Sequence, residues 1–320
     1  MLTAFAVMCG GLLILTYGAD RFVDGAAAIA TNFGVPAILV GLVIVGFATS
    51  APEMLVSAVA AWDGNPSLGI GNALGSNITN VGLVLGVTAL CVPMTVRSDI
   101  LGREFPLLFV VLGVSTMTLW DHALSRAEGI LLLAGMVVMM AATVWLALHV
   151  RRDDPIVAEI DRERPPRMSG VRATVWLALG LALLLVGSRF VVSGAVDIAA
   201  RLGISDVVIG LTIVAIGTSL PELAASIASA WKDEHDIALG NVLGSNMFNG
   251  LGVLGMPALI APGSFEAAVL RRDVPCMLLL TLALYLMCRP RRGQQRIGRL
   301  DGAILLTAFV TYQVMLFLDH

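Results

Sequence analysis

The chain has 320 residues, of which 58% are hydrophobic and 13% are charged, and its mean hydropathy is +0.89. Soluble globular domains carry about 25% charged residues, so this composition excludes that class. The formal net charge of −3 is spread over short polar loops and gives no reason to expect a nucleic-acid partner.

Apolar runs long enough to cross a hydrocarbon core of about 30 Å recur along the whole chain. Backbone groups in lipid must be satisfied internally, so these runs indicate helices and an all-α integral membrane protein. We predict ten transmembrane helices, near residues 3–24, 35–62, 68–93, 104–120, 127–150, 172–197, 204–231, 237–261, 272–288 and 300–318. The first run lacks a basic n-region and an A-x-A cleavage signal, so we expect a retained helix rather than a signal peptide.

The second predicted helix carries the string T-S-x-P-E, which ends at Glu53. An acid this deep in the membrane costs at least about 2.5–3.5 kcal/mol to insert, which makes it a functional candidate. Pro52 has no N–H and clashes with the Ala48 carbonyl, so a freed carbonyl can face a cavity. Helical spacing places Thr49, Ser50 and Glu53 on one face.

The third predicted helix carries the string G-N-x-L-G-S-N-x-x-N. Gly71 and Gly75 form a G-x-x-x-G pair, as do Gly240 and Gly244 in the second half, and such pairs are typical of helices that approach each other closely. Ser76 and Asn80 are four residues apart and share a face. We therefore expect their oxygens to lie within reach of the carboxylate on the preceding helix.

A polar segment at 151–171 separates a first half, 1–150, from a second half, 172–320, each with five predicted helices. Basic residues concentrate in this segment and in the loop 289–299. By the positive-inside rule this side is cytoplasmic, so both termini are expected outside a cell inner or plasma membrane that the chain crosses many times.

The second half repeats the first at a constant offset of 169 residues. Segments 41–87 and 210–256 are identical at 21 of 47 positions without a gap, and the identities include polar and helix-breaking residues. Five crossings are an odd number, so the second copy enters the membrane from the opposite side. Inverted repeats of this kind are common in secondary transporters. A duplication kept only for packing would not retain Glu, Asn, Ser and Thr.

The repeat duplicates every oxygen-bearing residue of the candidate site. The second copies are Thr218, Ser219, Glu222, Ser245 and Asn249. Carboxylate, hydroxyl and carbonyl oxygens without thiolate or imidazole select hard cations, and six to eight oxygens suit Ca²⁺. Na⁺ accepts the same ligands. Two glutamates neutralise one Ca²⁺ and would leave three Na⁺ with one positive charge, so an exchange in this ratio would move charge.

Other functional classes find little support in the chain. An enzyme would need a nucleophile–base pair or a metal cluster, and the sequence has no G-x-S-x-G or H-E-x-x-H string. A sensor or receptor would need a sizeable soluble domain, whereas the longest polar segment has about 20 residues. The four cysteines lie in or beside apolar runs and are expected to be small buried residues rather than metal ligands.

The strings GFATSAPE with GNALGSNITN, and AIGTSLPE with GNVLGSNMFN, resemble the two repeats of the cation/Ca²⁺ exchanger superfamily, and especially its prokaryotic sodium/calcium exchangers. The resemblance implies that the second, third, seventh and eighth helices form the ion-binding core, and that the first and sixth are a mobile gating pair. It also implies overlapping sites for three Na⁺ and one Ca²⁺. The implied ligands are Thr49, Ser50, Glu53, Ser76, Asn80, Thr218, Ser219, Glu222, Ser245, Asn249 and the carbonyls of Gly46 and Ala215.

One feature departs from the family pattern. Members often carry an acid at the last position of one G-S-N string, whereas this chain has Asn80 and Asn249. A third carboxylate is therefore absent, and K⁺ co-transport is not expected. H⁺/Ca²⁺ antiport stays open as an alternative, in which protonation of Glu53 and Glu222 replaces Na⁺ binding. Beyond the transported ions and the bilayer, we expect no cofactor and no obligatory protein partner.

Overall fold

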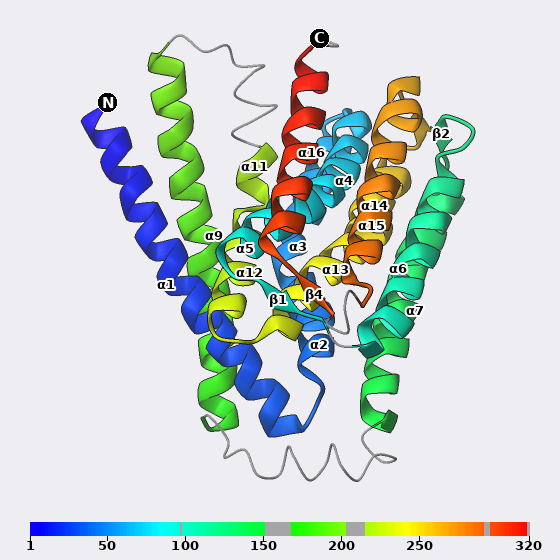
Figure 1. The fold of residues 1–320 in the computed structure, drawn as a ribbon. Coiled ribbons are helices and arrows are strands. Elements are labelled where there is room, and N and C mark those ends of the chain that lie inside the picture. Colours follow the sequence, from blue (N-terminus) through cyan, green and yellow to red (C-terminus); the bar gives the residue numbers. More distant parts are fainter. Residues whose placement is uncertain (97, 151–167, 203–214, 291–294, 319–320) are drawn as a thin grey trace.

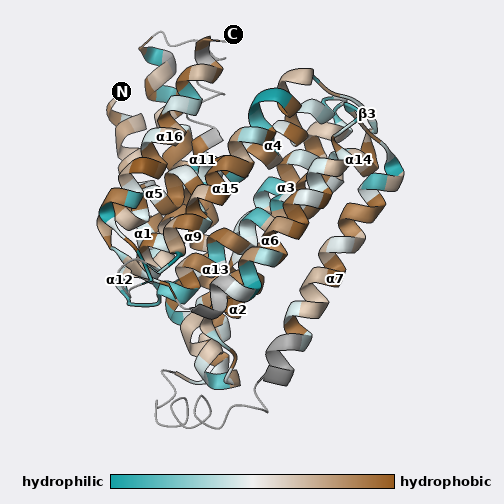
Figure 2. Ribbon diagram, turned by 45° about the vertical axis from the view of Figure 1, so that its right-hand side comes forward, coloured by the Kyte–Doolittle hydropathy of each residue, from teal (hydrophilic) through white to brown (hydrophobic). Residues whose placement is uncertain are grey.

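The computed structural model describes residues 1–96, 98–150, 168–202, 215–290 and 295–318. Within these ranges the chain is mostly helical, and the helices run roughly side by side (Figure 1). Figure 2 shows hydrophobic residues along the helices and hydrophilic residues mainly at the turns. Seven described stretches are long and apolar enough to span a membrane: Leu2–Phe33, Ala37–Trp62, Pro66–Cys91, Arg126–Trp145, Gly170–Ala199, His235–Ile260 and Arg299–Leu316.

The first half begins with one long helix and continues with two helices that contain π-helical turns. In chain order its elements are α1 (Leu2–Phe33), α2 (Ala37–Leu39), η1 (Val40–Val45), α3 (Gly46–Trp62), α4 (Pro66–Thr79), η2 (Asn80–Leu85), α5 (Gly86–Cys91), β1 (Met94–Thr95), α6 (Ser98–Thr118), β2 (Ala123–Leu124) and α7 (Arg126–Val150). α1 ends where Gly34 adopts a left-handed conformation, and Pro36 follows. α4 begins at Pro66 behind the N-cap residue Asn65.

The second half follows the same plan. Its described elements are α9 (Gly170–Arg201), α11 (Ala215–Thr218), α12 (Leu220–Trp231), α13 (His235–Phe248), η4 (Asn249–Val253), α14 (Leu254–Ile260), β3 (Gly263–Ser264), η5 (Val269–Asp273), α15 (Val274–Cys288), β4 (Arg296–Ile297) and α16 (Arg299–Leu318). The helix of α4 and that of α13 each change to π-helical geometry at the same repeat position, Asn80 and Asn249.

The two long helices α1 and α9 pack along much of their length, backbone against backbone (Figure 1). Glycines at seven-residue spacing make this possible on both helices. A β-carbon at Gly18 would lie 2.9 Å from the Leu184 nitrogen, and one at Gly187 would lie 2.6 Å from the Leu15 nitrogen. The contacting glycines are Gly11, Gly18, Gly25, Gly180, Gly187 and Gly194, and the second three follow the first by 169 residues. Helices that interlock in this way are expected to move as one unit.

α13 lies at the centre of the molecule. The most apolar part of the stretch His235–Ile260, which contains α13, η4 and α14, is completely buried. It packs against η1 and α3 of the first half and against α12 of its own half. Gly240 and Gly244 allow this contact, because a β-carbon at Gly240 would lie 2.8 Å from the Leu42 nitrogen. The close approach predicted from G-x-x-x-G is confirmed for this second pair.

Two short antiparallel strand pairs join the halves. Met94 pairs with Ile297 and Thr95 with Arg296, while Ala123 pairs with Ser264 and Leu124 with Gly263. β1 and β3 occupy equivalent positions of the repeat, 169 residues apart, and each belongs to a different strand pair. The chain ends marked N and C lie at one end of the molecule, whereas α7 ends and α9 begins at the other (Figure 1).

Some predictions differ from the structure or lie outside its described ranges. No atom of the described residues comes within 4 Å of a β-carbon placed on Gly71 or Gly75, so the close approach predicted there is not seen. The residues equivalent to Gly41 and Leu42, 210–211, are outside the described ranges. So are most of the predicted linker 151–171 and the start of the predicted helix 204–231.

Candidate cation-binding site

The first T-S-x-P-E string lies within α3, on the face that is turned into the protein. Thr49 and Ser50 are fully buried and Glu53 is 1% exposed. α3 runs through Pro52 without interruption. The predicted shared face is therefore confirmed, and it carries a carboxylate into the interior of the molecule.

The second string is held by a broken helix, and its Thr218 is only half-buried, unlike Thr49. Thr218 ends α11, Ser219 forms a turn, and Glu222 lies in the first turn of α12. Ser219 is 2% exposed and Glu222 is 1% exposed. The same motif thus adopts a continuous helix in one copy and an interrupted helix in the other.

The two copies meet through their side chains. The Thr49 hydroxyl lies 3.1 Å from Asn241 Oδ1 and 3.4 Å from Ser245 Oγ, and it also interacts with the Glu222 side chain. The Ser245 hydroxyl donates to the Gly46 carbonyl at 3.4 Å. Residues from both repeats therefore form a single cluster of oxygens.

Several buried oxygens of the predicted ligands have no hydrogen-bond partner among the described residues. They are Ser50 Oγ, Glu53 Oε2, Asn80 Oδ1, Ser219 Oγ, Glu222 Oε2 and Asn249 Oδ1. These six atoms form three pairs at the repeat offset of 169, and all six belong to predicted ligands. A buried polar group without a partner costs about 1–3 kcal/mol, and a bound cation would satisfy such oxygens.

The remaining predicted ligands also belong to the core elements. Ser76 is 5% exposed and Ser245 is fully buried. The Gly46 carbonyl faces Thr49 and Ser245, whereas Ala215 is described only as the first residue of α11. Over the described ranges, no group of three or more His, Cys, Asp or Glu side chains is arranged to hold a metal. Any cation held here would be bound mainly by neutral oxygens and by the two carboxylates.

Asparagines that the sequence analysis left out hold the acids in place. Asn72 Nδ2 donates to the Glu53 carbonyl and to the Ser57 hydroxyl, both at 3.1 Å. Asn241 makes the equivalent bonds to Glu222 and Ser226, at 3.3 and 3.0 Å. The duplicated G-N dipeptide was the signal that could have identified both. Asn246, next to Ser245, was also left out; its amide is fully buried and has no described partner.

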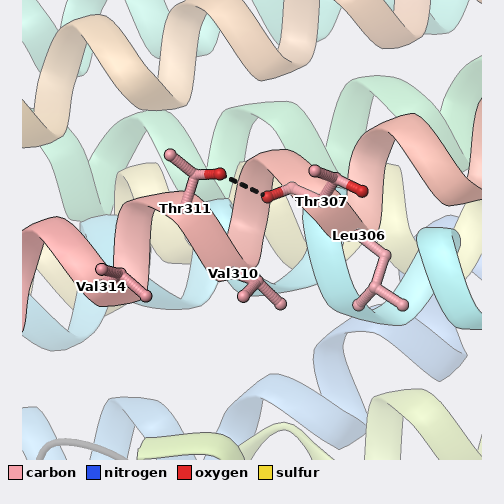
Figure 3. A pocket seen from close by; sticks show the side chains of 5 residues that line it. All are labelled: Leu306, Thr307, Val310, Thr311 and Val314. Atoms are coloured by element: carbon pink, nitrogen blue, oxygen red, sulfur yellow. Dashed lines mark hydrogen bonds between the residues drawn. The ribbon is translucent and has the colours of Figure 1, made fainter.

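A shallow pocket of about 390 Å³ lies elsewhere, on the outer face of α16. Figure 3 shows that side chains of this one helix line it: Leu306, Thr307, Val310, Thr311 and Val314. The hydroxyls of Thr307 and Thr311 donate to carbonyls of their own helix at 2.8 and 2.9 Å. The pocket lacks charged groups and shares no residue with the cluster, so we assign it no part in cation binding.

Comparison with known proteins adds independent information. The profile of a family described as "Sodium/calcium exchanger protein" matches residues 3–145 and 172–318. CaxA of Alkalimonas amylolytica is 50% identical over 317 residues, 99% of each chain. The inner membrane protein YrbG of Escherichia coli is 41% identical and covers 99% of this chain and 98% of its own. The sodium/calcium exchanger MaX1 of Methanosarcina acetivorans is 30% identical, over 98% of each chain.

Solved structures agree with these matches. A structure of the sodium-calcium exchanger NCX_Mj soaked with Na⁺ and Ca²⁺ has a TM-score of 0.82 at 33% identity and covers 97% of both chains. Another, soaked without either ion, has a TM-score of 0.83 and covers 97% of this chain and 98% of its own. The likeness extends over the whole fold and not over the repeated motifs alone.

Proposed function

Since the chain belongs to the sodium/calcium exchanger protein family, we propose that it exchanges Ca²⁺ for Na⁺ across the membrane by alternating access. The observation that carries this proposal is the set of unpaired, buried oxygens, which repeats at an offset of 169 residues and includes one oxygen of each carboxylate. Na⁺ and Ca²⁺ are hard cations of similar size that prefer such oxygens. The protein would act as a transporter rather than as an enzyme.

The proposed ligands come from α3, α4, η2, α11, α12, α13 and η4, together with the turn at Ser219. They are the side chains of Thr49, Ser50, Glu53, Ser76, Asn80, Thr218, Ser219, Glu222, Ser245 and Asn249, and the carbonyls of Gly46 and Ala215. Two carboxylates balance one Ca²⁺, whereas three Na⁺ carry one charge more. An exchange of three Na⁺ for one Ca²⁺ is therefore electrogenic in this proposal.

The proposed topology has ten transmembrane helices in two inverted repeats, with both termini outside and the segment 151–171 in the cytoplasm. Three observations support it: the common end of the two termini, the seven-residue glycine spacing on both α1 and α9, and the strand pairs that join the halves. The concentration of arginines in 151–172 and 289–299 supports the orientation.

Transport by the purified protein in liposomes tests the function. We expect an outward-directed Na⁺ gradient to drive ⁴⁵Ca²⁺ uptake at fixed pH, and an inside-negative potential to change the uptake rate. Uptake that is independent of Na⁺ but depends on a pH gradient would refute this proposal in favour of H⁺/Ca²⁺ antiport. No Ca²⁺ flux under either gradient would refute both.

A further inference from the structure

A lysine in the turn between α12 and α13 fastens the α1–α9 pair to the core. Lys232, which follows α12, lies 2.6 Å from Asp20 Oδ1 and 2.7 Å from Asp24 Oδ1, and it donates to the Asp20 carbonyl at 2.8 Å. The lysine side chain is only 22% exposed. Because α12 carries Glu222 and α1 is interlocked with α9, this contact joins the long helix pair to the candidate site.

The repeat places a second acid–base pair at the equivalent positions. Adding 169 to Asp20 gives Arg189 on α9, and subtracting 169 from Lys232 gives Asp63 at the end of α3. The two pairs are therefore related by the repeat, but their charges are exchanged. In the first pair α1 supplies the acid, Asp20, and in the second pair α9 supplies the base, Arg189. Because the charge of the partner is reversed as well, both pairs are attractive.

Only one of the two pairs is formed in this structure. Asp63 and Arg189 are exposed, and over the described ranges neither side chain makes an ion pair or a hydrogen bond. Lys232 and Asp63 occupy equivalent positions of the repeat, but only Lys232 has an ion pair with the α1–α9 pair in this structure.

We infer that Lys232 with Asp20, and Asp63 with Arg189, are alternating latches that hold the α1–α9 pair at opposite ends of the core. The inference rests on the proposed function, because inverted repeats exchange their conformations when a transporter changes its open side. In the exchanged arrangement, Arg189 takes the place beside Asp63 that Asp20 holds beside Lys232. Each pair then stabilises one state and must break before the other state forms.

Chemical cross-linking tests the latch without any transport measurement. The experiment uses the full chain with Cys9, Cys91, Cys276 and Cys288 changed to Ala. Asp63→Cys with Arg189→Cys is treated with a short bis-maleimide, because the Asp and Arg side chains together reach further than a disulfide allows. We expect a cross-link whose yield changes between Na⁺ and Ca²⁺. The yield from Asp20→Cys with Lys232→Cys should change in the opposite direction.

A matched control places the second cysteine elsewhere on the same helix. Arg201 lies 12 residues beyond Arg189, about 18 Å along α9 at 1.5 Å per residue. Asp63→Cys with Arg201→Cys should therefore give no ion-dependent product. Absence of the 63–189 product under every ion condition, or equal yields for the control, would overturn the inference.

Charge exchange supplies a functional readout. Asp63→Arg places two bases together and should slow exchange by up to about fivefold, the range of a partly exposed ion pair. Adding Arg189→Asp should restore the rate, whereas Arg189→Asp alone should not reach the wild-type rate. A double variant as slow as Asp63→Arg would contradict the latch. If the wild type itself moves no Ca²⁺, the proposed function fails, while the cross-links still report on the latch.

Discussion

Asn241 holds Glu222 by the backbone rather than by the carboxylate. Its side-chain nitrogen donates to the Glu222 carbonyl at 3.3 Å, and its oxygen faces the Thr49 hydroxyl at 3.1 Å. The amide thus leaves the carboxylate free for a cation and at the same time links the two repeats. In the first repeat, Asn72 likewise donates to the Glu53 carbonyl.

Asn241→Ala should weaken Ca²⁺ binding strongly, because it removes a donor from the Glu222 carbonyl and an acceptor from Thr49. Loss of a buried partner costs about 1–3 kcal/mol, so the KM for Ca²⁺ should rise at least about fivefold. Asn72→Ala should have a smaller effect, since Asn72 is only partly buried. Concentration dependence of ⁴⁵Ca²⁺ uptake measures both. An unchanged KM in Asn241→Ala would contradict the positioning role.

Glu53→Gln and Glu222→Gln should each abolish Ca²⁺ transport while leaving the protein folded. Each change keeps the shape of the side chain but removes one of the two charges that balance Ca²⁺. Glu128→Gln is the matched control, because Glu128 is a half-buried acid away from the predicted ligands that bonds to Ser125 at the start of α7. It should transport at the wild-type rate. Near-normal uptake in either site variant would exclude that acid as an essential ligand.

Ser188→Ala should disturb the second ion-binding segment. Pro221 has no N–H for the Gly217 carbonyl, and the buried Ser188 hydroxyl of α9 donates to it at 2.8 Å instead. Without this bond, peptides that cover 215–224 should exchange amide hydrogen faster in the ion-free protein. Ser193→Ala serves as the control, since that hydroxyl bonds to its own helix. Equal exchange in wild type and Ser188→Ala would show that the bond does not hold the segment.

Gly11→Ala should destabilise the protein, whereas its neighbour Gly10 should tolerate the same change. A β-carbon on Gly11 would lie 2.7 Å from the Val191 nitrogen, but one on Gly10 meets no described atom within 4 Å. An alanine in a helix is otherwise favoured over glycine by about 1 kcal/mol. Thermal unfolding in detergent should therefore show a lower Tm for Gly11→Ala and an equal or higher Tm for Gly10→Ala. The reverse order would contradict the close packing of α1 on α9.

Many helix bounds could be predicted, because a helix joined to its neighbours by short loops has about the same length as its apolar run. The predicted 127–150 and 300–318 match α7 and α16 to within a residue at each end. The first helix was predicted to end at residue 24 but continues to Phe33. Hydropathy falls at Asp20 and Asp24, whereas the helix continues past both acids, which pair with Lys232, distant in sequence.

The burial of the site could also be predicted. Both halves keep the same polar residues and the same proline at the same spacing, which indicates a common function inside the protein. The different paths of the two T-S-x-P-E strings could not. Pro52 and Pro221 occupy equivalent positions, yet α3 is continuous and the second copy breaks at Ser219. Ser188 on α9 donates to the Gly217 carbonyl where α1 has Ala19, so the two copies differ in a contact that lies outside the motif itself.

The central position of α13 has a consequence for how the polypeptide assembles. Its surroundings include η1 and α3, so the first half supplies part of the interior of the second. Neither half made alone would have its apolar faces covered by protein. Two separate chains, divided in the polar stretch between them and produced in the same cell, should therefore find each other in the bilayer and rebuild the complete transporter.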